Sequence, residues 1–352
     1  MPITERQPRV TIKDVALAAG VHFTTVSLAL RHHPSIPAST RERIETEAKR
    51  IGYAPNPVFA ALTHFRVHGR VRATPPRVAY IINHPLEKYQ HEQSFWAGAK
   101  EQAEMLGYDL ELISVSQGHH DSKSLTRYLR AQNITGIIIG AFEPGLAELK
   151  LDWRDYAIVK IDSLHMEPQT TSVSNDQRQD VRMAFREMRA RGYRRIGLAV
   201  GRASEESIQF RYTAGYLIER SSIPLEDHVP ELHFPHQAPW GKVSELIGNW
   251  IRKHKIEAVL CNWSSLGQLL TDAGLRVPKD VACACLCLTG ESNGLAGIRP
   301  NLHMVGVKAV SLLTSQLKQD SRGVAAFASN TYVRSRWQDG PSAPQKIFAT
   351  VS

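Results

Sequence analysis

The sequence predicts an α/β protein with a small all-helical head and a larger body of parallel sheets in two lobes. Three observations support this fold class: helical periodicity over residues 10–53, β-runs that alternate with helical runs from Arg77 onward, and a basic, proline-ended stretch between the two parts. At roughly 150 residues per domain, the 352 residues are enough for two or three domains.

Three short helices are expected in the head, over residues 11–19, 22–30 and 39–51. Thr11 can cap the first helix, and Gly20 ends it because glycine tolerates left-handed backbone. Helices of this length are marginal in water, so they must pack on one another. Their spacing predicts the following shared core: Ile12, Val15, Ala16, Ala19, Val26, Leu30, Ile44, Ala48 and Ile51.

The first two helices have the features of a helix-turn-helix. They are joined through Gly20, and Ala16 is small enough for a close crossing. The second helix of such a pair can enter the major groove of DNA. The charge agrees, because residues 1–76 carry +6 of the net +9, which favours DNA over the alternative of a helical hairpin with no nucleic-acid role.

The body is predicted from six apolar β-runs with helical runs between them. Continuous apolar strands separated by helices are typical of parallel sheets covered on both faces. The expected strands lie at residues 77–83, 108–115, 135–142, 156–163, 195–200 and 257–263, and the clearest helices at 94–106 and 179–192.

The composition excludes several classes of protein. Hydrophobic residues make up 42% and charged residues 22%, and no apolar run approaches the ~20 residues needed to span a bilayer. The polar N-terminal stretch has no secretory pattern, so we expect a cytoplasmic protein without a membrane partner. The cysteines are read as small buried hydrophobes and not as a metal or redox site: Cys261, Cys283, Cys285 and Cys287.

Several stretches together are typical of one family: VTIKDVALAAGV, TVS, TRERI and IGYAPNP in the head, and GYRRIGLAV, AGLRVPKDVA and, more weakly, RWQDG in the body. On these stretches the sequence resembles the lactose-repressor family of bacterial transcription regulators. The resemblance implies two lobes like those of periplasmic sugar-binding proteins, crossed three times by the chain, with a small ligand between them. It also implies a homodimer on a palindromic operator.

The resemblance sets the expected domain boundaries. The head with its hinge helix covers residues 1–63, the hinge itself 56–63, the linker 64–76, the body 77–340 and a tail 341–352. Within the body, the first lobe is assigned to residues 77–173 and 301–322. The second lobe is assigned to 174–300 and 323–340.

DNA-binding residues follow from the same resemblance. The positions that face base edges in the family are here Phe23, Thr24 and Leu28. Position 28 is commonly arginine, which reads guanine with two hydrogen bonds, whereas leucine offers only apolar contact, and His22 replaces the usual serine cap. The operator sequence therefore does not carry over. Phosphate contacts are expected from Thr11, Thr25, Ser27 and either Lys13 or Arg31.

The segment after the head resembles the family's hinge helix, which orders on the operator. Asn56 would cap it, and Leu62 matches a leucine that inserts into the minor groove. A flexible linker with an incidental leucine is the alternative.

Ligands of open α/β sheets bind at the carboxyl ends of strands. This rule points to Asn83 and His84, to Asp162 and Ser163, and to Asn262 and Trp263. By resemblance, Asp162 and Asn262 match positions that bind the effector, Arg211 lies near the family's effector arginine, and Cys287 replaces a common aspartate. Four aromatic side chains could stack on a sugar or simply pack: Phe95, Trp96, Trp240 and Trp263.

The sequence therefore predicts a DNA-binding transcriptional regulator, and we expect a repressor controlled by a small molecule, with a carbohydrate as the first candidate. A regulator that no longer senses a ligand and a sugar-binding receptor are the alternatives. No cofactor and no enzymatic activity are expected, because dinucleotide, P-loop and nucleophile-elbow motifs are absent from the sequence.

Overall fold

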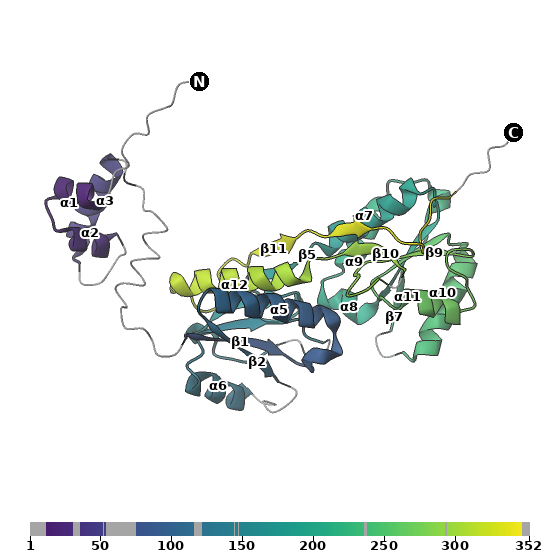
Figure 1. The fold of residues 1–352 in the computed structure, drawn as a ribbon, viewed down its shortest axis with the longest axis horizontal. Helices are drawn as coiled ribbons and strands as arrows, with labels where there is room; N and C mark the ends of the chain where they lie inside the picture. Colours follow the sequence, from purple (N-terminus) through teal and green to yellow (C-terminus); the bar gives the residue numbers. More distant parts are fainter. Residues whose placement is uncertain are drawn as a thin grey trace, which may run out of the picture. The chain divides into compact units, whose positions relative to one another are not determined.

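The computed structural model describes residues 12–30, 36–51, 53, 75–115, 122–143, 145–146, 148–235, 238–292 and 294–346. The chain divides into two compact units, Met1–Ala73 and Thr74–Ser352 (Figure 1). The predicted hinge helix with Asn56 and Leu62 lies outside the described residues, as do Thr11 and Arg31.

The described part of the first unit has the three predicted helices, α1 (Ile12–Ala19), α2 (Phe23–Ala29) and α3 (Ala38–Arg50). Gly20 has a φ of 62°, and the Val21 amide donates to the Ala16 carbonyl at 3.0 Å. The glycine therefore ends α1 with the left-handed turn that its position predicted. Each helix contributes a fully buried side chain to one small core: Val15, Val26 and Ile44.

The first lobe of the second unit is a six-stranded parallel sheet in the order β11-β5-β4-β3-β1-β2. Its strands are β1 (Arg77–Ile82), β2 (Asp109–Ser114), β3 (Gly136–Ile139), β4 (Ala157–Ile161), β5 (Ser172–Asn175) and β11 (Asn330–Val333). Helices α5 (Gln90–Met105) and α12 (Leu302–Lys318) cover one face, and α6 (Ser122–Ala131) covers the other (Figure 1). Short 3-10 helices lie at Leu86–Lys88 and Trp153–Asp155.

Strand β1 shows why its sequence is apolar throughout. Val78, Tyr80 and Ile82 pack in the core beneath α5 and α12. The alternate residues Ala79 and Ile81 pack in the core beneath α6. Since both faces of the sheet are covered, every position of the strand benefits from an apolar side chain.

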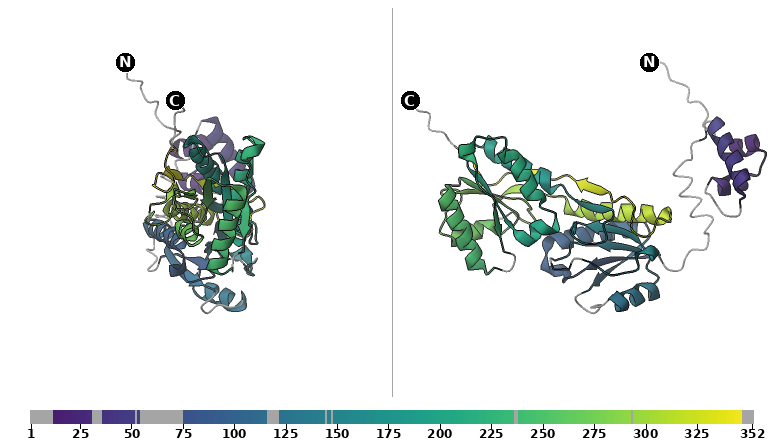
Figure 2. Two further views of the ribbon diagram at one scale, coloured as in Figure 1. Left: turned by 90° about the vertical axis from the view of Figure 1, so that its right-hand side faces the viewer. Right: turned by 180° about the vertical axis from the view of Figure 1, so that it is seen from behind.

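The second lobe repeats the plan in the order β12-β10-β9-β8-β6-β7, with β12 antiparallel to β10. Its strands are β6 (Ile196–Gly201), β7 (Leu232–Phe234), β8 (Ala258–Cys261), β9 (Ala282–Cys285), β10 (Ala296–Arg299) and β12 (Arg336–Gln338). Helices α7 (Gln177–Ala190) and α9 (Arg211–Arg220) cover one face, and α10 (Trp240–His254) and α11 (Leu266–Asp272) the other (Figure 2). Helix α8 (Arg202–Ser207) follows β6, and a 3-10 helix spans Leu225–Asp227.

The chain passes between the lobes three times, after β5, after β10 and after β11. Two of the expected boundaries need correction. Strand β11 pairs with β5 in the first sheet, whereas residues 323–340 were assigned as a whole to the second lobe. Residues 341–346 are no free tail, because Ser342 accepts a hydrogen bond from the Ala296 amide at 2.9 Å and donates one to the Cys283 carbonyl at 2.7 Å.

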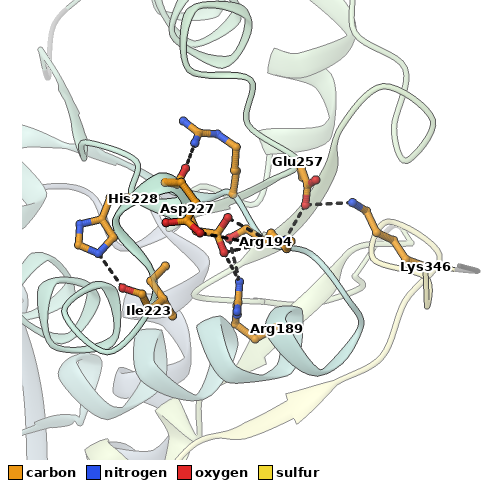
Figure 3. A network of polar contacts seen from close by, with 9 residues as sticks. Arg189, Arg194, Ile223, Asp227, His228, Glu257 and Lys346 are labelled. Atoms are coloured by element: carbon orange, nitrogen blue, oxygen red, sulfur yellow. Dashed lines mark hydrogen bonds and ion pairs between the residues drawn. The ribbon is translucent and has the colours of Figure 1, made fainter.

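A network of ion pairs lies at the amino ends of the strands in the second lobe (Figure 3). Arg189 and Arg194 both bind the carboxylate of Asp227, at 3.3 and 3.1 Å. Glu257 accepts a hydrogen bond from the Arg194 amide at 2.6 Å and pairs with Lys346 at 2.9 Å. Because Arg194 precedes β6 and Glu257 precedes β8, this network anchors the start of two central strands.

Helices α5 and α12 lie side by side at close range because each has a glycine at the contact (Figure 1). A Cβ atom on Gly98 would lie 2.0 Å from the carbonyl oxygen of His303, and one on Gly306 would lie 2.0 Å from that of Phe95. Both neighbours are backbone atoms, so a side chain at either position forces the helices apart.

We predict that Gly98→Ala destabilises the second unit by about 1–3 kcal/mol or more, because overpacking at a backbone contact strains both helices. Gly241→Ala is the matched control, since Gly241 also lies in a helix, and a Cβ added there would meet no heavy atom of the described residues within 4 Å. The control is expected to be neutral or to gain up to about 1 kcal/mol. Urea unfolding of both variants measures the difference, and equal stabilities would contradict the close contact.

Candidate functional site

A cavity of about 440 Å³ lies at the carboxyl ends of strands from both sheets. The first lobe contributes residues after β3 and β4, and the second contributes residues after β8 and β9. This is the edge at which open α/β sheets bind ligands. The lining includes four of the residues expected to bind an effector: Asp162, Asn262, Trp263 and Cys287.

Asp162 is the central charged group of the cavity. Its Oδ1 accepts a hydrogen bond from the side-chain amide of Gln177 at 3.0 Å. Burial raises the pKa of Asp162 to about 6, although the Gln177 hydrogen bond and the positive charge of Arg211 both act to lower it. Gln177 begins α7, so this bond joins the end of β4 in the first lobe to the first helix of the second.

Two pairs of strained residues border the cavity. Asp162 and Ser163 have φ values of 48° and 44°, and Gln209 and Phe210 have 56° and 55°. Such left-handed backbone is unfavourable for residues other than glycine and clusters at functional sites. Ser163 holds its own turn, because its hydroxyl donates to the Gly140 carbonyl and accepts from the Phe142 amide, both at 2.8 Å.

The two strained segments also contact each other across the lobes. The amide of Leu164 donates to the carbonyl of Ser207 at 3.0 Å, and the side chain of Gln209 donates to the carbonyl of Leu164 at 3.1 Å. The wall of the cavity is therefore continuous between the lobes on this side.

Three amide side chains in the lining have buried oxygen atoms with no hydrogen-bond partner among the described residues. These atoms are Asn175 Oδ1, Gln177 Oε1 and Asn262 Oδ1. A buried acceptor without a partner costs about 1–3 kcal/mol, and native proteins leave few of them. All three residues line the cavity, so these unsatisfied acceptors lie around it.

Glu92 of α5 does not line the cavity itself but holds a residue that does. It is fully buried, accepts a hydrogen bond from the Tyr80 hydroxyl at 2.5 Å and accepts one from the Ala141 amide at 3.2 Å. Ala141 itself lines the cavity. Burial raises the pKa of Glu92 to about 8, so the group is protonated at neutral pH.

Aromatic rings supply much of the apolar lining. Trp263 packs edge-on against Phe234 at a centroid distance of 4.6 Å, and Tyr89 stacks on His91 at 5.2 Å. Of the four aromatics singled out in the sequence, Phe95 and Trp263 line the cavity. Trp96 packs on Tyr80, and Trp240 donates to Asp272 on the outer face of the second lobe.

His84 and Arg211 were expected at the ligand, and the structure places neither in the lining. The two ring nitrogens of His84 face the backbone carbonyls of Pro85 and Ala141, at 3.0 and 2.9 Å. The guanidinium of Arg211 donates to Ser174 at 3.2 Å and Tyr332 at 2.9 Å, and it lies over the Tyr332 ring. His84 is therefore held by backbone carbonyls, and Arg211 by side chains distant in sequence. The sequence motifs revealed neither set of partners.

The sequence reasoning missed several lining residues: Tyr89, His91, Asn175, Gln177, Ser204, Ser207, Tyr212 and Thr289. Asn175 and Gln177 lie at the carboxyl end of β5. Strand β5 has the polar sequence SVSN, which lacks the apolar run used to find the other strands. The rule that strand ends carry the ligand would have found both residues had this strand been recognised.

In the head, the predicted base-reading residues lie on α2. Phe23 is 45% exposed, and its ring lies 4.3 Å from that of His22. Thr25 and Leu28 are half-buried. Thr24 and Ser27 also lie on α2, but their side chains are outside the described part of the structure.

Two family models match the chain in the order of its two units. Residues 11–56 match the bacterial regulatory proteins of the lacI family, and residues 81–229 match the periplasmic binding proteins and sugar binding domain of the LacI family. The chain belongs to the lacI family of bacterial regulatory proteins. It is a transcriptional regulator with a DNA-binding domain and a domain of the sugar-binding type.

Individual proteins agree with this assignment. Catabolite control protein A of Priestia megaterium is 24% identical over 326 residues, which cover 89% of this chain and 94% of that protein. Among solved structures, a complex of the transcriptional regulator CelR with cellobiose matches with a TM-score of 0.58 at 17% identity, covering 95% of this chain and 100% of that one. A lac repressor dimer bound to operator and the anti-inducer ONPF matches with a TM-score of 0.56 at 19% identity, over 96% and 100%.

The described residues contain no membrane-spanning helix, no group of side chains that could hold a metal ion, and no disulfide. No helix there is long and apolar enough to cross a membrane. Within the same ranges, no three His, Cys, Asp or Glu side chains gather closely enough to hold a metal ion. All four cysteines have free thiols, and the three on β8 and β9 are fully buried in the second lobe: Cys261, Cys283 and Cys285.

We predict that the protonated Glu92 makes stability depend on pH. Between the ordinary glutamate pKa of 4.5 and the raised value of about 8, the folded chain holds a proton that the unfolded chain releases. The free energy of unfolding therefore falls as pH rises through this window, by about 1.4 kcal/mol per pH unit for this group alone.

Glu92→Gln removes the titration but keeps a side chain that can bond to Tyr80 and Ala141. Its stability relative to the natural chain should therefore rise steadily from pH 5 to pH 8, as measured by urea unfolding. Glu104→Gln is the control, because Glu104 is exposed on the same helix. Parallel pH profiles of the Glu92→Gln variant and the natural chain would refute the assignment.

Proposed function

We propose that this regulator binds a palindromic operator as a homodimer, acts as a repressor in the cytoplasm, and is controlled by a carbohydrate effector in the cavity between its lobes. The observation that carries the proposal is the presence, in one chain, of a helix-turn-helix and a cavity built from the carboxyl ends of two sheets. The lac repressor dimer on its operator, which shares the fold, supports the dimeric arrangement.

The DNA-binding roles proposed for the head follow the geometry of the second helix. Phe23, Thr24 and Leu28 would face the bases, and Thr25 and Ser27 the phosphates, together with Thr11 and Arg31. Asn56 and Leu62 would form the hinge that inserts into the minor groove. The partial burial of Leu28 fits an apolar contact more readily than a polar one.

The effector role rests on the chemistry of the lining. Hydroxyl and amide groups from both lobes surround the space, including Ser163, Ser204, Asn175 and Asn262, and aromatic rings complete it. Ligand sites commonly combine an apolar wall with a few placed polar groups in a volume of about 300–1,000 Å³. The unpartnered amide oxygens favour a ligand-sensing regulator over one that has lost its effector. The DNA-binding head favours a regulator over a sugar receptor.

We predict that selection from random DNA yields an inverted repeat for the natural chain. In Leu28→Arg, each half-site should gain a preference for guanine at one position, worth about 1–3 kcal/mol, because arginine can bond twice to guanine. Leu17→Arg is the control for added charge, since Leu17 is 87% exposed on α1, and its consensus should not change. Failure to enrich any sequence with the natural chain would overturn the DNA-binding proposal.

We also predict that Asn262→Ala weakens carbohydrate binding. A thermal-shift screen of common mono- and disaccharides, including glucose and cellobiose, identifies a binder, which is then titrated by calorimetry. Loss of one hydrogen bond should raise its Kd about threefold to tenfold. Asn249→Ala on the exposed side of α10 is the control. Equal affinities for all three proteins would place the sugar elsewhere.

A further inference from the structure

The charges around the cavity are unbalanced. Its lining contains the carboxyl groups of Asp162 and Glu143 and the imidazole of His91, and no lysine or arginine of the described residues. The residues between 75 and 346 that the structure leaves undescribed include no lysine or arginine either. Burial lowers the pKa of His91 to about 4, so this ring is neutral at physiological pH.

One of the two carboxylates has its own partners. Glu143 pairs with Lys88 and accepts a hydrogen bond from the Tyr89 hydroxyl at 2.7 Å. The carboxylate of Asp162 has only the neutral side-chain amide of Gln177 as a hydrogen-bond partner among the described residues. The positive charge of Arg211 also acts on Asp162, but its guanidinium is engaged by Ser174 and Tyr332 outside the lining. Asp162 therefore leaves the cavity electronegative.

The neutral amide side chains of the lining also have unsatisfied hydrogen-bond acceptors. The NH₂ group of Gln177 donates to Asp162, which fixes the orientation of this amide and leaves its oxygen without a partner among the described residues. The oxygens of Asn175 and Asn262 are likewise free in the described structure. All three residues belong to the lining, so unsatisfied acceptors lie around the cavity near Asp162.

We propose that the cavity selects its effector by charge. It takes ligands that are rich in hydrogen-bond donors and carry no negative charge, such as neutral or amino sugars, and it rejects their phosphate and carboxylate derivatives. Asp162 is the residue that discriminates. This inference rests on the proposed effector role of the cavity, because it specifies the class of ligand that the same site accepts.

The chain contains its own reporter of the cavity's charge. Cys287 lines the cavity and is partly exposed, whereas the other three cysteines are fully buried. Burial raises the pKa of its thiol, and the negative charge of Asp162 acts in the same direction. The reaction of Cys287 with small thiol reagents of different charge therefore measures the local potential without requiring that the natural effector be known.

The test compares three methanethiosulfonates on the full-length protein at pH 7.5: the cationic aminoethyl, the anionic sulfonatoethyl and the neutral methyl reagent. Labelling is followed by intact mass, and each rate is divided by that of the same reagent with 2-mercaptoethanol. We expect the cationic reagent to exceed the anionic one by about tenfold, because the charge of Asp162, which has no cation as a hydrogen-bond partner among the described residues, acts at short range. Thiolate formation is common to all three reactions and cancels in the ratio.

Three variants identify the source of the effect. Cys287→Ser should abolish the labelling, which assigns it to this thiol. Asp162→Asn should bring the ratio toward one. Asp320→Asn should leave it unchanged, because Asp320 lies on the surface beside Arg322. A ratio of one or below in the natural chain overturns the inference, even if the Asp162→Asn variant does not fold.

A binding experiment separates this inference from the proposed function. Glucose, glucosamine and glucose 6-phosphate, and the screened binder with its phosphate ester, are titrated by calorimetry. Binding of the neutral or amino sugar with at least about tenfold weaker binding of the phosphate supports charge selection. Equal or tighter binding of the phosphate refutes it and leaves the effector role intact. If even the neutral thiol reagent fails to enter and no sugar binds, the effector role and the inference both fail.

Discussion

The partial burial of one carboxylate at the junction of two sheets is the constraint on which the ligand site depends. Asp162 follows β4 in a left-handed turn, and the only hydrogen-bond partner of its carboxylate in the described structure is the side-chain amide of Gln177 at the start of α7. This bond is one of those that join the lobes, and it fixes the orientation of the Gln177 amide. Burial opposes the charge of the carboxylate, so its environment favours a ligand that supplies hydrogen-bond donors.

Polar groups are paired at the amino ends of the strands in the second sheet, whereas some remain unpaired at the carboxyl ends within the described structure. At the amino ends of β6 and β8, arginine and lysine side chains neutralise Asp227 and Glu257, and the polar groups there are satisfied within the chain (Figure 3). At the carboxyl ends, Asn262 keeps an unpartnered oxygen within the described structure. The stretch GYRRIGLAV therefore serves the fold, and the residues after the strands serve the site. A family motif and a functional site are different things in this lobe.

The sequence predicted the parts of the fold that depend on apolar burial and much less of what depends on distant partners. All six expected strands exist, because β1 and its equivalents need apolar residues on both faces. The other six strands of the described structure, β5, β7, β9, β10, β11 and β12, escaped recognition because each has only three or four residues, and β5 and β11, with sequences SVSN and NTYV, are also polar. Asp162 and Asn262 could be placed by the strand-end rule. Arg211 could not, because Tyr332, which holds it, lies 121 residues away in sequence.

The shared construction of the cavity determines how a ligand can influence the rest of the chain. Asp162 and Ser163 come from the first lobe, Asn262 and Cys287 from the second, and the backbone bond from Leu164 to Ser207 already links the two. A ligand that contacts both sets binds best to the arrangement of lobes that brings them within reach together. It can shift the equilibrium only by the difference in its affinity for the two arrangements, typically about 1–3 kcal/mol. Charge selection at Asp162 therefore decides which molecules can supply that difference, because a ligand repelled from the carboxylate contacts neither arrangement well enough to favour one.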